Sequence, residues 1–211
     1  MSFADEIAIV DYGAGNLRSV SRALEAVGAR VRIATRVEDL RSARKIVLPG
    51  VGAFGNGMAG LTARGLVEPL RRAAQEGVPI LGICLGMQLF FPASEESPGV
   101  EGLGFLPGEV RAFRLTDLKV PHTGWNQIWP KRPTPLLDGL KPGDYAYFNH
   151  GYYCAPAEEA DVLAVTDYGL RYASVVGRGN LYGVQFHPEK SQAVGLRILR
   201  NFVRLGSGGD A

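Results

Sequence analysis

The residues of this chain best suited to chemistry are a cysteine and the glycines on either side of it. Gly82-Ile83-Cys84-Leu85-Gly86 follows an apolar run that ends at Leu81 and precedes a helix-like stretch, residues 87–91. A nucleophile between glycines on a sharp strand-to-helix turn is the elbow written G-x-S-x-G in serine hydrolases, here with sulfur in place of oxygen. Such a turn strains the backbone and leaves no room for nearby Cβ atoms. We expect the Cys84 thiol to lie at a helix N-terminus, which favours the thiolate.

A second segment supplies the groups that a cysteine nucleophile needs. Residues 181–186 alternate like a strand and lead into His187-Pro188-Glu189. A thiol requires a base to accept its proton and a third group to orient that base. Pro188 fixes one backbone dihedral between the two polar residues and limits how far they can splay. A lone His-Pro-Glu is usually an ordinary loop, and a lone cysteine is usually buried and inert. Taken together, they predict a Cys84-His187-Glu189 triad.

Acyl transfer by such a triad also needs backbone N–H groups to hold the developing oxyanion. The residue after the nucleophile, Leu85, offers one. Pro49-Gly50-Val51-Gly52 ends a neighbouring predicted strand, and ligand loops of open α/β sheets lie at that end. On its own a Pro-Gly-x-Gly segment is a plain turn. Its position one strand before the elbow favours a role for it as the second donor.

The elements that position these residues follow from hydrophobic periodicity. Continuous apolar runs predict strands that are buried on both faces. Apolar residues at helical spacing between Asn16, a candidate N-cap, and Gly28, a candidate C-terminal stop, predict a helix. Alternation of strands and helices with short connections predicts a parallel sheet covered by helices on both faces. The predicted strands are 7–10, 31–33, 45–48 and 79–83, and the predicted helices are 17–27 and about 66–75.

The second half of the chain has a different sequence pattern. Beyond Ser94, Gly, Pro and aromatic residues punctuate short alternating runs, which predicts hairpins added to the sheet as antiparallel or mixed strands. A helix from about Ser191 to Leu205 is expected to close the fold. We expect residues 1–206 to form one domain and residues 207–211 to be a disordered tail, because the tail has no apolar anchors.

Composition narrows the functional classes. The 211 residues are 46% hydrophobic, which suits one substantial core. With 23 basic and 21 acidic residues the net charge is +2, so neither nucleic acid nor a membrane surface is indicated as a partner. The acidic start is not that of a signal peptide, and no apolar run approaches a bilayer span. Two cysteines are not a disulfide framework. These features predict a cytoplasmic protein, and we expect no metal or cofactor.

Together the segments resemble the triad class of glutamine amidotransferases. That likeness rests on Gly82-Ile-Cys84-Leu-Gly86-Met-Gln88 and on His187-Pro-Glu189. Within the class, the chain is similar to the glutaminase subunits of imidazole glycerol phosphate synthases. The segments that carry this closer likeness are Asp11–Leu17, Pro49–Phe54, Val120–Asn126, Tyr147–His150 and His187–Ser191.

The resemblance implies a fold, a reaction and a partner. The fold would be the α/β sheet of class I glutamine amidotransferases. Cys84 would attack the side-chain amide of glutamine, His187 would relay protons and Glu189 would hold the imidazole. Ammonia would pass to a (β/α)8-barrel cyclase subunit in a heterodimer, which makes imidazole glycerol phosphate and aminoimidazole carboxamide ribotide in histidine biosynthesis. The further residues that the resemblance assigns are Val51 and Leu85 for the oxyanion, Gly50, Gly52, Gln88 and Glu96 for glutamine, and Asn16, Trp125 and Lys190 for the partner.

Other functions remain open at this point. The glutaminase partner of pyridoxal phosphate or anthranilate synthesis would carry the same triad. A stand-alone γ-glutamyl hydrolase or a catalytically dead scaffold are further alternatives, although a dead scaffold has no need of an intact triad. We interpret His122, His150 and Cys154 as structural. Gly151 departs from the family, which commonly has serine there, and nothing in the sequence explains Asn149.

Overall fold

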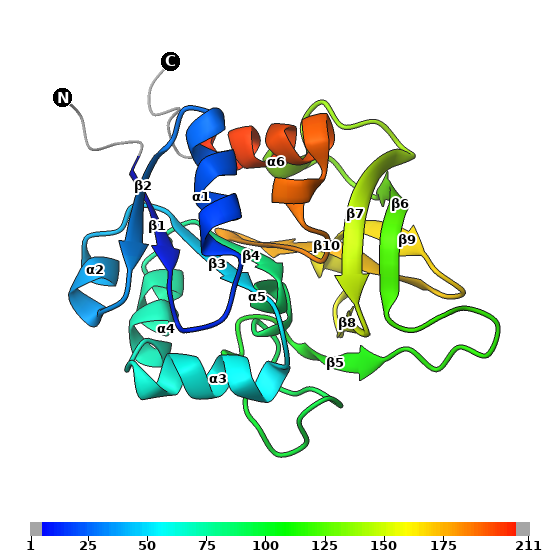
Figure 1. The fold of residues 1–211 in the computed structure, drawn as a ribbon, viewed down its shortest axis with the longest axis horizontal. Helices are drawn as coiled ribbons and strands as arrows, with labels where there is room; N and C mark the ends of the chain where they lie inside the picture. Colours follow the sequence, from blue (N-terminus) through cyan, green and yellow to red (C-terminus); the bar gives the residue numbers. More distant parts are fainter. Residues whose placement is uncertain (1–5, 206–211) are drawn as a thin grey trace.

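The computed structural model describes residues 6–205, so the tail expected at 207–211 lies outside the described part. A single mixed sheet runs through the molecule, with helices on both of its faces (Figure 1). The strands are β1 Glu6–Val10, β2 Arg30–Ala34, β3 Ile46–Gly50, β4 Ile80–Cys84, β5 Gly108–Ala112, β6 His122–Pro130, β7 Asp144–His150, β8 Tyr152–Pro156, β9 Val162–Asp167, β10 Arg171–Arg178 and β11 Leu181–Val184.

Helices connect and cover these strands. The helices are α1 Leu17–Ala26, α2 Val37–Arg41, α3 Phe54–Ala63, α4 Val67–Gln75, α5 Leu85–Gln88 and α6 Gln192–Arg204, with 3₁₀ turns η2 Pro135–Leu137, η3 Glu159–Asp161 and η4 Pro188–Lys190. The elements predicted around 17–27, 66–75 and 191–205 correspond to α1, α4 and α6.

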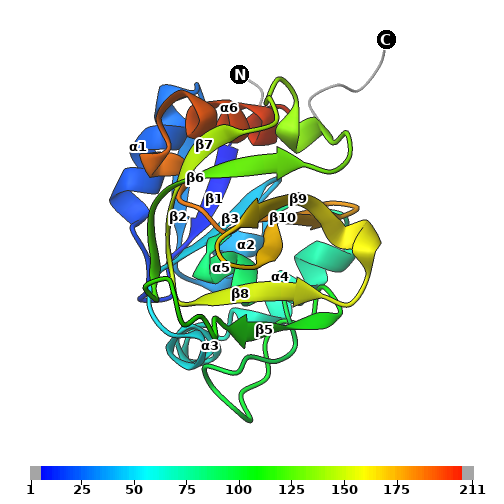
Figure 2. The same cartoon turned by 90° about the vertical axis from the view of Figure 1, so that its right-hand side faces the viewer.

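The strand order separates a parallel half from an antiparallel half. The order is β2-β1-β3-β4-β11-β10-β9-β6-β7, with β5 and β8 attached through β10. Strands β2, β1, β3, β4 and β11 pair in parallel, and the later strands pair antiparallel. Figure 2 shows β6 and β7 on one side of β9 and β10, and β5 and β8 on the other. The predicted mixed α/β sheet with antiparallel additions is confirmed.

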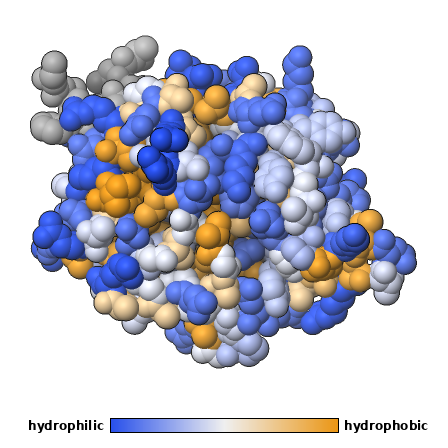
Figure 3. Space-filling view, viewed as in Figure 1, coloured by the Kyte–Doolittle hydropathy of each residue, from blue (hydrophilic) through white to orange (hydrophobic). Residues whose placement is uncertain are grey.

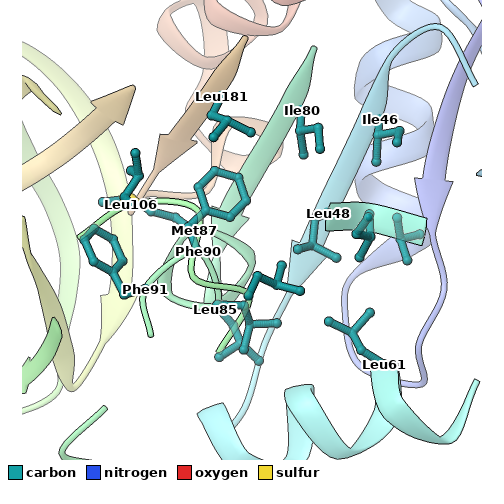
Figure 4. Packing of buried hydrophobic residues seen from close by; sticks show 14 of the residues in the cluster. Ile46, Leu48, Leu61, Ile80, Leu85, Met87, Phe90, Phe91, Leu106 and Leu181 are labelled. Carbon is teal, nitrogen blue, oxygen red and sulfur yellow. The ribbon is translucent and has the colours of Figure 1, made fainter. Parts of the chain in front are cut away.

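The buried strands alternate between two cores, as a strand covered on both faces must. In β1, Ala8 and Val10 pack with α3 and α4, whereas Ile7 and Ile9 pack with α1 and α6. Figure 4 shows the first of these cores, where Leu48 of β3 lies near Leu61 of α3. This double burial fixes the sheet rigidly, so the loops at its carboxyl edge have a firm support.

Three local predictions need correction. Asn16 precedes α1, but its side chain makes no capping hydrogen bond within residues 6–205. The helices α2 and α3 were not predicted. The helix after Cys84 spans only Leu85–Gln88, so its dipole contributes less to a thiolate than a long helix would.

The surface has no large apolar belt on the face seen in Figure 3, where hydrophilic residues predominate and hydrophobic ones form small, separated groups. Within residues 6–205, every helix is too short or too polar to span a bilayer.

Candidate active site

Strand register brings the predicted site together at the carboxyl ends of three neighbouring strands. Gly50 at the end of β3 pairs with Cys84 at the end of β4, and Val184 of β11 pairs with Ile83. His187 follows β11 by three residues. Parallel strands present their carboxyl ends at one edge, where ligands of open α/β sheets bind. Segments far apart in sequence therefore converge on one sulfur atom.

The elbow has the backbone that the sequence predicts. Cys84 adopts φ 53 and ψ −110, a positive φ that residues other than glycine rarely take. A Cβ on Gly86 would lie 1.7 Å from the carbonyl oxygen of Leu48, and one on Gly82 would lie 2.7 Å from that of Gly86. The strain thus sits on the nucleophile itself, and the two glycines are required for space.

The base and its orienting group form a buried pair. His187 Nδ1 lies 2.9 Å from Glu189 Oε1, and both side chains are almost fully buried. The other imidazole nitrogen is left to hydrogen-bond with Cys84. Burial alone would lower the pKa of His187, but the hydrogen bonds and charges of Cys84 and Glu189 outweigh it and raise the pKa to about 10. The imidazole therefore holds its proton at neutral pH.

The position of His187 depends on a serine that the sequence did not single out. Ser191 Oγ donates to the carbonyl of His187 at 2.7 Å, and the N–H of Tyr147 donates to Ser191 Oγ at 2.9 Å. The N–H of His187 donates to the carbonyl of Tyr147 at 2.9 Å. Strand β7 thus fixes the backbone of the base from one side. A serine four residues after His187 on a short turn was the available signal.

A pocket opens over the sulfur and contains most of the predicted site residues. Gly50 is buried and does not line the pocket, and Asn16 and Trp125 do not line it either. The lining residues are Val51, Gly52, Cys84, Leu85, Gln88, Glu96, Asn149, His150, Gly151, Tyr152, His187 and Lys190.

Two polar side chains in the pocket use part of their hydrogen-bonding capacity within the protein. Gln88 Nε2 donates to the carbonyl of Tyr152 at 3.1 Å and to Gln185 Oε1 at 3.3 Å. Glu96 Oε2 accepts the N–H of Phe54 at 2.7 Å. One oxygen of each side chain, Oε1 in both, remains as an acceptor for a ligand. Acceptors of this kind suit an ammonium or amide N–H group.

The glycine-rich loop after β3 is held at its base. The Tyr12 hydroxyl donates to the carbonyl of Pro49 at 2.7 Å. A Cβ on Gly50 would lie 2.3 Å from this hydroxyl oxygen and 2.8 Å from the Cβ of Leu85. Gly52 instead has φ +99, and apart from its own chain neighbours no described atom lies within 4 Å of where its Cβ would be. Gly50, at the start of the loop, is thus closely packed, whereas Gly52, at its end, has space beside it.

Two of the three residues expected at a partner interface lie together. The Trp125 ring packs edge-on against Tyr147 with centroids 6.1 Å apart, and Lys190 Nζ lies 5.6 Å from the centroid of Tyr147. Trp125 is 47% exposed. Asn16 is half-buried and directly precedes α1, which packs against the η4 turn that carries Lys190.

Asn149 and Gly151 border the nucleophile. The carbonyl oxygen of Asn149 lies 3.9 Å from Cys84 Sγ, and its side-chain oxygen accepts the Thr123 hydroxyl at 3.1 Å. A Cβ on Gly151 would meet only Val120 and Pro121, at 3.8 Å and 4.0 Å. A larger side chain would fit at position 151, so steric crowding does not explain the glycine.

The remaining histidines form a buried neutral network beside the pocket. His150 Nδ1 donates to the carbonyl of Tyr152 at 2.7 Å, which leaves its Nε2 to accept from His122 Nδ1 and the Tyr172 hydroxyl, at 3.3 Å each. Asn126 donates to His122 Nε2 at 3.3 Å. Burial lowers the pKa of His122 to about 4 and that of His150 to about 3. This bonding agrees with a structural interpretation of both.

Acid should therefore destabilise the fold through these two imidazoles. The unfolded chain takes up their protons below about pH 6.5, whereas the folded chain takes them up only near pH 4 and 3. Stability is then lost as pH falls through this window, by up to about 1.4 kcal/mol per pH unit for each histidine. His187 does not contribute there, because its raised pKa affects stability only above pH 6.5. Urea unfolding as a function of pH should give a shallower slope for His122→Asn, and an unchanged slope would contradict the assignment.

Cys154 has none of the features of the elbow. It is buried within β8, and burial raises the pKa of its thiol well above the ordinary value. Such a thiol stays protonated and unreactive.

The comparisons with known proteins agree with this geometry. The model of the family "Glutamine amidotransferase class-I" matches residues 8–205. The chain is 50% identical over 199 residues to the imidazole glycerol phosphate synthase subunit HisH of Moorella thermoacetica, with 94% of each chain covered. It is 50% identical over 202 residues to the protein of the same name from Syntrophotalea carbinolica, with 93% of this chain and 98% of the relative covered. A crystal structure of a glutamine amidotransferase superposes with a TM-score of 0.75 at 20% identity, over 93% of this chain and 97% of the other, which supports the fold.

Proposed function

The chain belongs to the class-I glutamine amidotransferase family, and we propose that it is the glutaminase subunit of an imidazole glycerol phosphate synthase. It hydrolyses glutamine to glutamate and ammonia, in histidine biosynthesis. The observation that carries the proposal is the strained Cys84 elbow facing the buried His187–Glu189 pair. Near-full-length identity of 50% to subunits of that synthase supports the specific pathway.

The reaction follows from the position of the proton. Because the His187 imidazole is protonated before the reaction begins, the sulfur of Cys84 attacks the amide carbon of glutamine, and a tetrahedral oxyanion forms. His187 gives its proton to the nitrogen, ammonia leaves, and the C–N bond is replaced by a thioester. A water molecule then loses a proton to His187 and attacks the thioester. Glutamate leaves and the sulfur regains its negative charge.

The pocket offers groups for the oxyanion and for the substrate. We assign the N–H groups of Leu85 and Val51 to the oxyanion. The free oxygens of Gln88 and Glu96 are suitable acceptors for the α-ammonium group of glutamine, because both side chains already use their other contacts within the protein. Gly52 leaves the approach open, and Gly50 sets the base of the loop.

A partner covers the pocket in this proposal. Three half-exposed apolar residues border its mouth or lie beside it: Val51 and Val120, each 44% exposed, and Trp125. Lys190 adds a charge over the Tyr147 ring, against which Trp125 packs. An apolar patch with a rim charge suits a protein interface. We assign this surface, with Asn16, to a cyclase subunit of (β/α)8-barrel type in a cytoplasmic heterodimer.

The triad roles make a graded prediction. In the two-subunit assay, His187→Asn should lower the turnover of glutamine by about 10²–10⁴, because both proton transfers lose their carrier. Glu189→Gln should cost less, since an amide oxygen can still accept from Nδ1 and only the negative charge is lost. Steady-state glutamate release at saturating glutamine measures both. A Glu189→Gln variant slower than His187→Asn would reverse these roles.

The same assay separates the alternatives. Product formed only with the cyclase and its ribotide supports the proposed pathway. Activity transferred to a pyridoxal phosphate or anthranilate synthase partner would favour another amidotransferase. Full activity without any partner would favour a stand-alone hydrolase, and none under any condition would favour a scaffold.

A further inference from the structure

One buried polar side chain at the nucleophile has no role in the triad. Gln185 lies directly after β11, between Val184 and Phe186, and is 0% exposed. A polar residue in so apolar a setting must find hydrogen-bond partners, because burying an unpaired amide is costly. Its side-chain Nε2 lies 3.8 Å from Cys84 Sγ, within hydrogen-bond range for sulfur. Its Oε1 accepts from Gln88 Nε2 at 3.3 Å.

A series of hydrogen bonds fixes the orientation of the Gln185 side-chain amide. The carbonyl of Tyr152 can only accept, so the group that Gln88 presents to it at 3.1 Å is its NH₂ group. The second hydrogen of that group goes to Gln185, which must therefore offer its oxygen. The NH₂ group of Gln185 is then left to face the sulfur. His150 Nδ1 also donates to the same Tyr152 carbonyl, at 2.7 Å.

We propose that Gln185 is a further catalytic residue, whose amide N–H donates to Cys84 Sγ and stabilises the sulfur whenever it carries negative charge. The inference rests on the proposed function, because it takes Cys84 as the nucleophile. In the proposed reaction the sulfur carries negative charge as it attacks and again when the thioester breaks. His187 gives up its proton to ammonia between those moments, whereas the Gln185 amide is neutral and its N–H stays in place throughout. It thus complements the imidazole.

Other groups that face the sulfur do not provide this donor. Burial raises the pKa of Tyr12, Tyr172 and Cys154, so all three remain neutral near neutral pH. The Tyr12 hydroxyl is directed to the carbonyl of Pro49 instead. Only His187 changes its proton in the reaction.

The remaining charged or titratable residues of the pocket are the same in every variant below. They are Glu96, His150, Tyr152 and Lys190. A difference between a Gln185 variant and the natural protein therefore reports on the amide.

The test is the rate at which iodoacetamide alkylates Cys84 in the full chain as a function of pH, followed peptide by peptide by mass spectrometry. Gln185→Met keeps the size and loses the donor. A hydrogen bond to a charged group is worth roughly a tenfold change, so the pH midpoint of alkylation should move upward by about one unit, and alkylation below that midpoint should slow about tenfold. Turnover of glutamine with the partner should fall with it, while KM changes little.

Controls separate this role from a structural one. Ser174→Ala alters an equally buried polar residue whose carbonyl accepts the N–H of Gln185 and whose hydroxyl has no partner among residues 6–205. It should leave the alkylation profile unchanged. Rates are compared in molecules whose buried Cys154 stays unmodified, which selects folded protein. Gln185→Glu keeps the acceptor for Gln88 and should slow alkylation further.

Two results would overturn the proposal: alkylation of Gln185→Met or Gln185→Glu as fast as that of the natural chain, or an equal slowing by Ser174→Ala. Because alkylation needs no glutamine, it decides on Gln185 even if the natural chain hydrolyses none, an outcome that would refute the proposed function separately.

Discussion

Replacement of Cys84 by alanine should abolish glutamine hydrolysis while synthesis from free ammonia continues. Loss of the nucleophile from a triad enzyme costs about 10⁶ in turnover, and no other thiol can substitute. Cys154 is buried in β8 and protonated. In the proposed complex the partner takes only ammonia from this chain, so an ammonium salt at high concentration, with the ribotide present, should restore the product. Glutamate release and product formation, measured on the same mixture, separate the two activities.

Cys154→Ala is the matched control, since it removes the other thiol of the chain. It should keep full glutaminase activity if it folds, and a glutamine-analogue electrophile should label Cys84 in it. Substantial glutamate release by Cys84→Ala would refute the triad. Loss of the ammonia-dependent product in that variant would mean that the substitution disturbs the complex as well as the chemistry.

Much of the fold was predictable because its strands are buried on both faces. The run Ile7–Val10 has no polar residue, and its side chains divide between two cores, so an apolar run was sufficient to identify β1. Helix α3 was not predicted, because Gly55, Gly57 and Gly60 weaken its helical sequence pattern. The structure explains one of them: a Cβ on Gly60 would lie 2.3 Å from the carbonyl oxygen of Tyr12. Close packing had overridden helix propensity.

The site was predictable where chemistry requires a residue type at a fixed spacing. That condition holds for Cys84 and for the His187–Glu189 pair. It fails for Ser191 and Gln185, which act through contacts across strands that no local spacing encodes. One signal for Gln185 was present, namely an amide within an apolar run, because buried polar residues are informative where they occur.

Coupling to the partner should appear as a stimulation of glutamine hydrolysis by about 10²–10³, the value of one oxyanion donor. The loop after β3 carries that donor at Val51. Our hypothesis is that this N–H points away from the pocket until the partner, with its ribotide, shifts the loop. Glutamate release is measured for the free chain, the complex, and the complex with ribotide. Equal rates in all three would refute coupling and favour a stand-alone hydrolase.

The structure indicates which glycine tests this hypothesis best. Gly50→Ala would push a Cβ to 2.3 Å from the Tyr12 hydroxyl and 2.8 Å from Leu85, so it would disturb the core. The Cβ of Gly52→Ala would meet no described atom within 4 Å beyond its own chain neighbours, so the substitution acts through its φ of +99. A side chain in the left-handed region costs about 1–2 kcal/mol, roughly five- to thirtyfold in an equilibrium. We expect the substitution to destabilise the loop conformation of the unpartnered chain by that factor. The rate of glutamine hydrolysis by the free chain should then rise, and the ratio of partnered to unpartnered rates should fall about tenfold.

Gly28→Ala provides the matched control for the loop. Gly28 has φ +92, and again no atom of residues 6–205 other than its chain neighbours lies within 4 Å of where its Cβ would be, but it follows the C-cap of α1 instead of bordering the pocket. The two substitutions should therefore cost similar stability in urea unfolding, and only Gly52→Ala should change the ratio of partnered to unpartnered rates. A ratio changed equally by both would trace the effect to general destabilisation, whereas a ratio changed by neither would mean that the loop does not move between two states.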